Sequence, residues 1–134
     1  MPAIVEISGV VKEYPLGKQV VQALRGIDLS IERGEFTTIA GPSGSGKTTL
    51  LNLCGAMDFP STGEVLINGQ ATTSLDDAHL TALRRGTIGF VFQSFQLLPS
   101  LTALENVELP LLLAGAKGSE ARARQILGWV GLAG

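Results

Sequence analysis

The chain of 134 residues contains a single cysteine, and only 5% of its residues are aromatic. One cysteine excludes an internal disulfide and suits a reducing compartment such as the cytosol. The formal net charge is −2, so no overall basic field favours nucleic acid as a partner. Apolar residues still make up 45% of the chain, which predicts one folded domain and not a disordered segment.

Long hydrophobic runs are also absent. The longest run covers residues 109–116, includes Pro110, and is far shorter than the ~20 residues that cross a bilayer. Glu6 and Lys12 interrupt the first apolar residues, so we expect no secretory signal. Any contact with a membrane is therefore expected to go through a partner.

Glycine, by contrast, is abundant, and one glycine-rich motif fits the P-loop pattern G-x-x-x-x-G-K-[ST]. Its residues are Gly41, Pro42, Ser43, Gly44, Ser45, Gly46, Lys47 and Thr48. Glycines allow a tight turn that brings backbone N–H groups close to phosphate oxygens. Lys47 would place a cation on the β- and γ-phosphates, and Thr48 would offer its hydroxyl to Mg²⁺.

The flanking residues have the pattern that this motif requires. Residues 36–40 are expected to form a short strand that leads into the loop. Leu50, Leu53, Cys54 and Met57 follow at the spacing of one helical face. The alternative is a glycine-rich turn with a chance lysine, but the strand–loop–helix context favours the P-loop.

The remaining pattern alternates strands and helices. Strands are expected over residues 4–14, 20–31, 65–67 and 88–92, with Asn68-Gly69 as a turn. Ser74 is expected to cap a helix that ends near Arg85, and Thr102 to cap a helical turn through Asn106. A last helix is expected over 119–132, with Ala123, Ile126, Leu127 and Val130 at core spacing.

These pieces together resemble the nucleotide-binding domain of ATP-binding-cassette (ABC) transporters. The P-loop is followed by Thr49 and two leucines, as is usual in that family. Tyr14 lies where the family has an aromatic residue that stacks on adenine, and Gln93 lies where it has the Q-loop glutamine. The segments 89–93, 97–99, 101–107 and 109–111 resemble the lipoprotein-release and macrolide-export subgroup, with the cell-division ABC ATPase close by. The resemblance covers the whole chain.

The resemblance implies an α/β P-loop NTPase fold for residues 1–134. It would comprise an antiparallel β subdomain, an incomplete RecA-like core, and the start of a helical subdomain at about residues 99–134. Tyr14 would bind adenine, residues 41–49 the phosphates, and Thr48 and Gln93 Mg²⁺, with Lys47 and Gln93 in catalytic roles. The family also implies ATP and Mg²⁺ as cofactors, membrane permease subunits and a second ATPase copy as partners, and a cytoplasmic place on the inner membrane.

Several motifs of a complete domain are not found. There is no Ser-Gly-Gly of an LSGGQ-type signature, no acidic residue after a run of four apolar residues as in Walker B, and no catalytic glutamate in that context. The only histidine, His79, precedes Gln93 and cannot be the switch histidine. We therefore expect an N-terminal part of such a domain, without ATP turnover of its own. The segments 36–40 and 88–92 should also lack their family neighbours in the sheet.

Alternative readings remain for the residues and for the function. Tyr14 is otherwise a half-buried aromatic at a strand end, and Gln93 a polar residue that closes a buried strand. The Leu109–Ala116 segment is either packing or a docking patch. A small P-loop kinase or GTPase is a second reading, against which Tyr14, Gln93 and the missing N-K-x-D motif argue. A third is a nucleotide-binding module without turnover.

Overall fold

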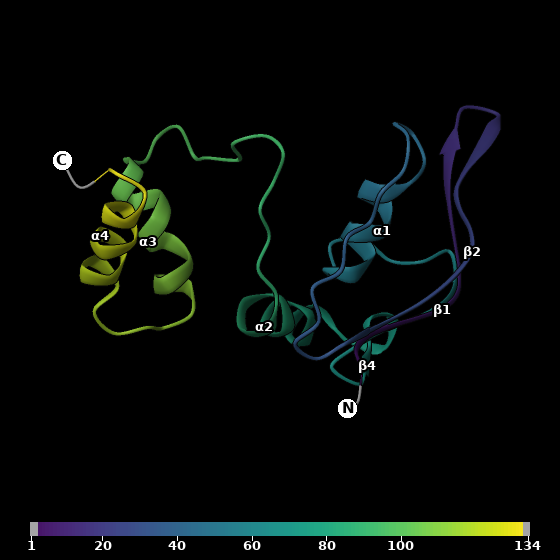
Figure 1. Ribbon diagram of the computed structural model, residues 1–134, viewed down its shortest axis with the longest axis horizontal. Coiled ribbons are helices and arrows are strands. Elements are labelled where there is room, and N and C mark those ends of the chain that lie inside the picture. The colour runs from purple at the N-terminus through teal and green to yellow at the C-terminus, as the bar shows by residue number, and fades with distance from the viewer. Residues whose placement is uncertain (1–2, 133–134) are drawn as a thin grey trace. The chain divides into compact units, whose positions relative to one another are not determined.

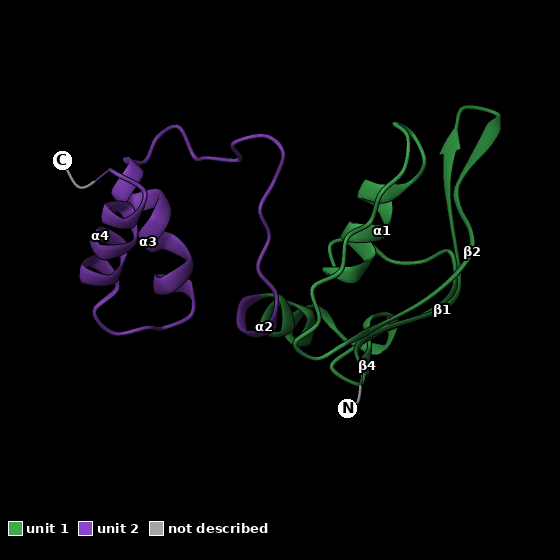
Figure 2. Ribbon diagram, viewed as in Figure 1, with its two compact units in different colours: residues 1–84 green, residues 85–134 purple. Residues whose placement is uncertain are grey.

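In the computed structural model, which describes residues 3–132, the chain divides into two compact units (Figures 1 and 2). The first comprises residues 1–84 and the second residues 85–134. None of the helices within residues 3–132 is long and apolar enough to cross a membrane.

An antiparallel sheet dominates the first unit. Its strands are β1 (Ala3–Leu16), β2 (Gln19–Glu32), β3 (Thr62–Ile67) and β4 (Gln70–Ala71), in the order β2-β1-β3-β4. Ile7, Val10, Leu24, Val65 and Ile67 supply most of its buried side chains. The antiparallel β part of the predicted fold is therefore present.

The β1–β2 hairpin extends further than the sequence indicated, because β1 continues through Pro15 and Leu16 to a turn at Gly17. Pro15 pairs with Val20 on β2, whereas pairing of β1 with β3 ends at Val11. The proline thus lies where β1 has a neighbour on one side only, and its missing N–H costs no ladder bond there. The Asn68-Gly69 turn between β3 and β4 is confirmed, with positive φ at both residues.

Helix α1 (Lys47–Cys54) follows the glycine-rich loop and buries Leu50 and Leu53. The prediction that Met57 belongs to its apolar face is wrong, because the helix ends at Cys54 and Met57 is exposed. Gly55 is the C-cap, and the Met57 amide turns back to the carbonyl of Asn52. A glycine that directly follows the last turn is a common stop for a helix.

Helix α2 (Asp77–Thr87) begins later than expected, because Asp76 caps it and Ser74 does not. The Asp76 carboxylate accepts from the His79 amide at 2.8 Å. Ser74 instead ends the 3₁₀ helix η1 (Thr72–Ser74). Aspartate and serine are equally good caps, so residue type alone does not distinguish Ser74 from Asp76. Asp76 is the cap because Ser74 is still part of η1.

The second unit contains α3 (Ala103–Leu113) and α4 (Ser119–Trp129). The cap at Thr102 is confirmed, although α3 runs well beyond Asn106 and includes Pro110. Ser119 donates to Glu108 at 2.7 Å and joins the two helices. Ala123 and Leu127 are buried as predicted, but α4 ends at Trp129, and Val130 lies beyond it and is exposed.

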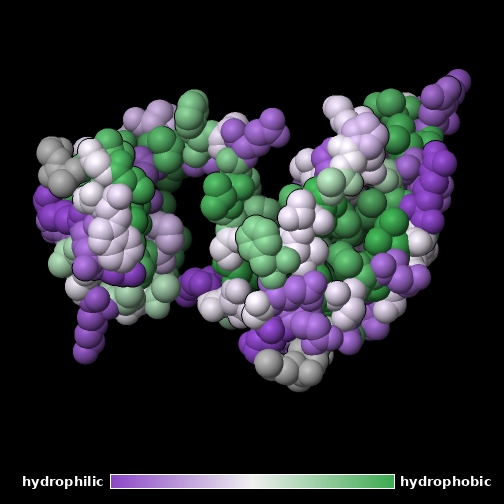
Figure 3. All heavy atoms as spheres, viewed as in Figure 1, coloured by the Kyte–Doolittle hydropathy of each residue, from purple (hydrophilic) through white to green (hydrophobic). Residues whose placement is uncertain are grey.

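Neither of the two segments that were expected to be strands of a central sheet forms a strand. Residues 36–40 and 88–92 lie outside regular structure, and Phe36 and Val91 are 95% and 99% exposed. The prediction of two strands here is wrong, because a strand exists only where another pairs with it, and none of the described residues does so. Hydrophobic side chains accordingly reach the surface of both units (Figure 3).

Candidate functional site

The loop at residues 41–46 closes onto the start of α1. The Ser45 amide bonds to the Pro42 carbonyl at 3.2 Å, and the Leu50 amide bonds to the Gly46 carbonyl at 2.9 Å. Gly46 is the N-cap in a left-handed conformation and offers no side-chain cap. The first backbone N–H groups of α1 therefore have no side-chain acceptor, and they lie at the positive end of the helix dipole.

Gly46 has no room for a side chain, whereas the close neighbour of Gly41 is a hydroxyl that can rotate away. A Cβ on Gly46 would lie 2.7 Å from the carbonyl oxygen of Ala23 on β2, and φ at Gly46 is +94°. A Cβ on Gly41 would lie 2.7 Å from Oγ of Ser45. The motif thus does more than turn the chain, because Gly46 sets the loop directly against the β2 backbone.

Lys47 is held over its own loop. Its Nζ donates to the carbonyl oxygens of Gly41 and Pro42, the latter at 2.8 Å. The side chain is half-buried, whereas Thr48 is exposed. A cation, free amides and a hydroxyl therefore lie within a few residues of one another, and this donor set suits a phosphate group and its metal.

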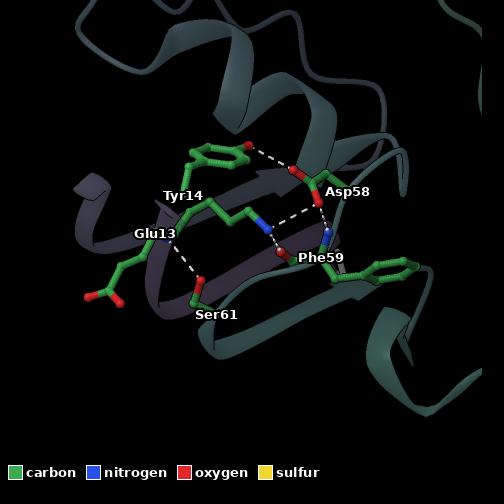
Figure 4. A network of polar contacts seen from close by, with 6 residues as sticks. Glu13, Tyr14, Asp58, Phe59 and Ser61 are labelled. Atoms are coloured by element: carbon green, nitrogen blue, oxygen red, sulfur yellow. Dashed lines mark hydrogen bonds and ion pairs between the residues drawn. The ribbon is translucent and has the colours of Figure 1, made fainter. Parts of the chain in front are cut away.

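Tyr14 belongs to a polar network between β1 and the segment that follows α1 (Figure 4). Its hydroxyl donates to Oδ2 of Asp58 at 2.7 Å. Nζ of Lys12 donates to Oδ1 of Asp58 at 3.1 Å and to the carbonyl oxygen of Phe59 at 2.7 Å. The same ammonium lies 5.0 Å from the centroid of the Tyr14 ring. The ring is thus held at its hydroxyl and covered on one face by a cation.

This network shifts the pKa of both titrating partners. Partial burial and then the hydrogen bond to Asp58 raise the pKa of Tyr14, while a hydrogen bond from Thr49 acts in the opposite direction. Burial alone raises the pKa of Asp58, but the bonds from Tyr14, the Phe59 amide and Lys12 outweigh it and lower that pKa below its ordinary value. The charged form of Asp58 is therefore the favoured partner of the tyrosine hydroxyl.

Gln93 lies in the second unit, on the exposed segment after residue 92. Its place beside a bound phosphate stays a prediction. Within residues 3–132 no group of three His, Cys, Asp or Glu side chains could hold a metal on its own. A hard cation such as Mg²⁺ would take its remaining ligands from phosphate oxygens and water.

Sequence reasoning missed Asp58 and Lys12 as members of the site. Lys12 and Tyr14 are two residues apart on β1, and such residues share one side of a strand. That spacing was a usable signal for Lys12. Asp58 is 44 residues from Tyr14 in sequence, and no local pattern reports a pairing over that distance.

Comparison with known proteins gives one consistent family. A family model described as "ABC transporter" matches residues 24–134. An uncharacterized ABC transporter ATP-binding protein of Methanocaldococcus jannaschii is 49% identical over 92% of this chain and 54% of its own length. The lipoprotein-releasing system ATP-binding protein LolD of Geobacter metallireducens is 46% identical over 99% of this chain and 60% of its own. The macrolide export ATP-binding/permease protein MacB of Rhodopseudomonas palustris is 47% identical over 96% of this chain and 20% of its own.

Solved structures agree with the sequence comparison. The dimeric post-hydrolysis structure of the ATP-binding cassette MJ0796, bound to ADP and Pi, is 48% identical and superposes with a TM-score of 0.86. It matches 92% of this chain and 56% of the solved one. The chain thus spans about half the length of its ATP-binding relatives. The chain belongs to the ABC transporter family, as its P-loop, Tyr14 and Gln93 predicted.

Proposed function

We propose that this chain binds Mg²⁺-ATP as the ATP-binding part of an ABC transporter ATPase. The observation that carries the proposal is the loop at residues 41–46, which is set against β2 by Gly46 and presents Lys47 and the first amides of α1 together. Backbone donors, a helix N-terminus and an ammonium in one place are a strong recognition site for a polyphosphate.

Each predicted residue has a role in this proposal. Lys47 and the loop amides hold the phosphates, and Tyr14 stacks on adenine. Thr48 and Gln93 supply oxygen ligands for Mg²⁺, which would neutralise the phosphate charge. An amide side chain can both ligate a metal and donate to water, so Gln93 can relate the state of the γ-phosphate to the coupled membrane protein.

The partners follow from the relatives. MacB is by name both ATP-binding and permease, LolD belongs to a lipoprotein-releasing system, and the solved cassette is dimeric. We therefore propose integral membrane permease subunits and a second ATPase copy as partners, at the cytoplasmic face of the inner membrane. An export or lipoprotein-release role is the leading candidate, and a role in the related cell-division complex is the alternative.

For the 134 residues by themselves, nucleotide binding without turnover is the second candidate. Hydrolysis of ATP needs an aspartate that holds the metal and a group that positions the attacking water. Among the acids of the sequence none follows a run of four apolar residues as a Walker B aspartate does. In this case the chain supplies the P-loop half of a site that another polypeptide segment completes.

ATP titration calorimetry on wild type, Lys47→Ala and Lys18→Ala tests the proposal. Lys18 lies in the exposed turn between β1 and β2 and controls for the loss of one positive charge. Lys47→Ala should weaken ATP binding by about 2–3 kcal/mol, the size of a charge-assisted hydrogen bond or more, while Lys18→Ala should bind as wild type does. In a separate assay, the wild-type chain should release phosphate from ATP no faster than the Lys47→Ala protein does. Equal ATP affinity in all three proteins would refute the P-loop assignment.

A further inference from the structure

The base-binding ring and the phosphate loop are joined by one short segment. Asp58 follows α1 closely, and α1 begins at Lys47 of the loop. The Asp58 amide bonds to the carbonyl of Asn52 near the end of α1, at 3.3 Å. The carboxylate of the same residue accepts from the Tyr14 hydroxyl. A single residue therefore connects the helix that follows the phosphate loop to the aromatic ring on β1.

The segment that carries Asp58 is itself fixed to β1 at several points. The Ser61 amide bonds to the Val11 carbonyl at 2.9 Å, and the Glu13 amide bonds to Oγ of Ser61 at 2.9 Å. Lys12 bonds to the Phe59 carbonyl, and the Phe59 amide bonds to Oδ1 of Asp58 at 2.8 Å. These bonds define where the Asp58 carboxylate lies, so it can act as a fixed anchor (Figure 4).

Lys12 restricts the ring from the other direction. Its ammonium lies over one face of Tyr14 and makes an ion pair with Asp58, and its side chain is only 14% exposed. Because the cation covers that face, a stacked base has only the opposite face available. The ring, which would otherwise turn about two side-chain bonds, is held in one tilt and at one distance from the loop.

We propose that Asp58, with Lys12, is a positioning residue for nucleobase recognition, because it holds the Tyr14 ring at a fixed place relative to the phosphate loop. This inference rests on the proposed function, since it assumes that ATP binds with its base on Tyr14. It assigns Asp58 no contact with the nucleotide. Its effect should therefore appear on ligands with a base and not on a bare polyphosphate.

The test compares Asp58→Ala with Asp77→Ala, which removes an exposed acid on α2 outside the network. Affinities for Mg²⁺-ATP and for inorganic tripolyphosphate are measured on each full chain. Asp58→Ala should weaken ATP about three- to tenfold, the cost of ordering one freed side chain on binding, and leave tripolyphosphate within about twofold. Unchanged tripolyphosphate binding also shows that the variant is folded around its loop.

A double-mutant cycle with Tyr14→Phe separates positioning from other effects. The phenylalanine keeps the stacking face and loses the bond to Asp58, so it should weaken ATP to a similar extent, and adding Asp58→Ala should cost nothing more. Tyr14 is the only tyrosine in the chain, so tyrosinate absorbance reports on it alone. Its titration midpoint should fall in Asp58→Ala and stay in place in Asp77→Ala.

The possible failures are distinct. Equal ATP affinities in Asp58→Ala and Asp77→Ala, or a parallel loss of ATP and tripolyphosphate in Asp58→Ala, would overturn the positioning role and leave the proposed function standing. Full additivity in the Tyr14→Phe background would overturn it as well. A wild-type chain that binds neither ligand would overturn the proposed function, and the positioning role with it.

Discussion

Single residues determine how the phosphate loop is built, and Gly46 is the clearest case. It adopts φ +94°, and an added Cβ would meet the Ala23 carbonyl. Gly86, on α2, is the opposite case, since an added Cβ there would have no neighbour within 4 Å. The two positions thus separate a glycine that the structure requires from one that it merely tolerates.

Gly46→Ala should destabilise the fold by at least about 1–3 kcal/mol, because a strained backbone conformation adds to the clash with β2. Gly86→Ala should instead stabilise it by up to about 1 kcal/mol, since alanine is the better helix former. Midpoints of urea unfolding at constant slope measure both effects. A Gly46→Ala protein as stable as wild type would show that the loop does not pack on β2 as described.

At the scale of elements, helix termini carry much of the polar structure. Thr102 and Glu105 form a reciprocal capping box at the start of α3, with bonds of 3.1 and 3.0 Å. These contacts lower the pKa of Glu105. The hydrogen bond from the Thr102 amide has the larger effect, and the bond from the Thr102 side chain adds to it. Because the pKa of Glu105 is lowered in the folded state, its carboxylate stabilises the start of the helix at pH values above the ordinary pKa of glutamate. This stabilisation is lost as the pH falls through the lowered value.

Acidification from pH 5 to pH 3 should therefore reduce amide-exchange protection in the first turn of α3, after correction for the intrinsic exchange rate. Glu105→Gln is the matched control, because glutamine can still accept the Thr102 amide but does not titrate. Protection in that turn should be nearly independent of pH in the variant. The same pH dependence in both proteins would mean that another group is responsible.

The elements also show which features the sequence could predict. The Asn68-Gly69 turn, the Thr102 cap and the P-loop were predictable because their residues are neighbours in sequence. The strand at 36–40 was not, since pairing depends on other parts of a sheet. The bond between Tyr14 and Asp58 was likewise beyond sequence patterns, because the hairpin and α1 separate them along the chain.

At the scale of the whole molecule, the unpaired segments are the main liability. Phe36 and Val91 are almost fully exposed, each beside backbone groups without a strand partner. Extended apolar segments with free N–H and C=O groups are templates for association between chains. The antiparallel sheet and the P-loop can thus be well formed while the surface of the isolated chain remains prone to aggregation.

Light scattering during a slow thermal ramp tests this expectation. The wild-type chain should aggregate before a sharp unfolding transition, and Phe36→Thr with Val91→Thr should raise the temperature at which scattering begins. Leu16→Thr is the control, because Leu16 is also exposed but lies in a paired strand. A monomeric wild-type chain with a cooperative, scattering-free transition would contradict the expectation.

Hydrogen exchange of the whole chain, with and without saturating Mg²⁺-ATP, is the sharpest test of nucleotide binding at the loop. Bound ATP should add protection in peptides that cover the loop at residues 41–46 and α1, where phosphate oxygens would accept from backbone amides. Peptides around Tyr14 should gain protection as well, and Lys47→Ala should lose both effects. Unchanged exchange across residues 41–54 at saturating ATP would show that this loop does not bind the nucleotide.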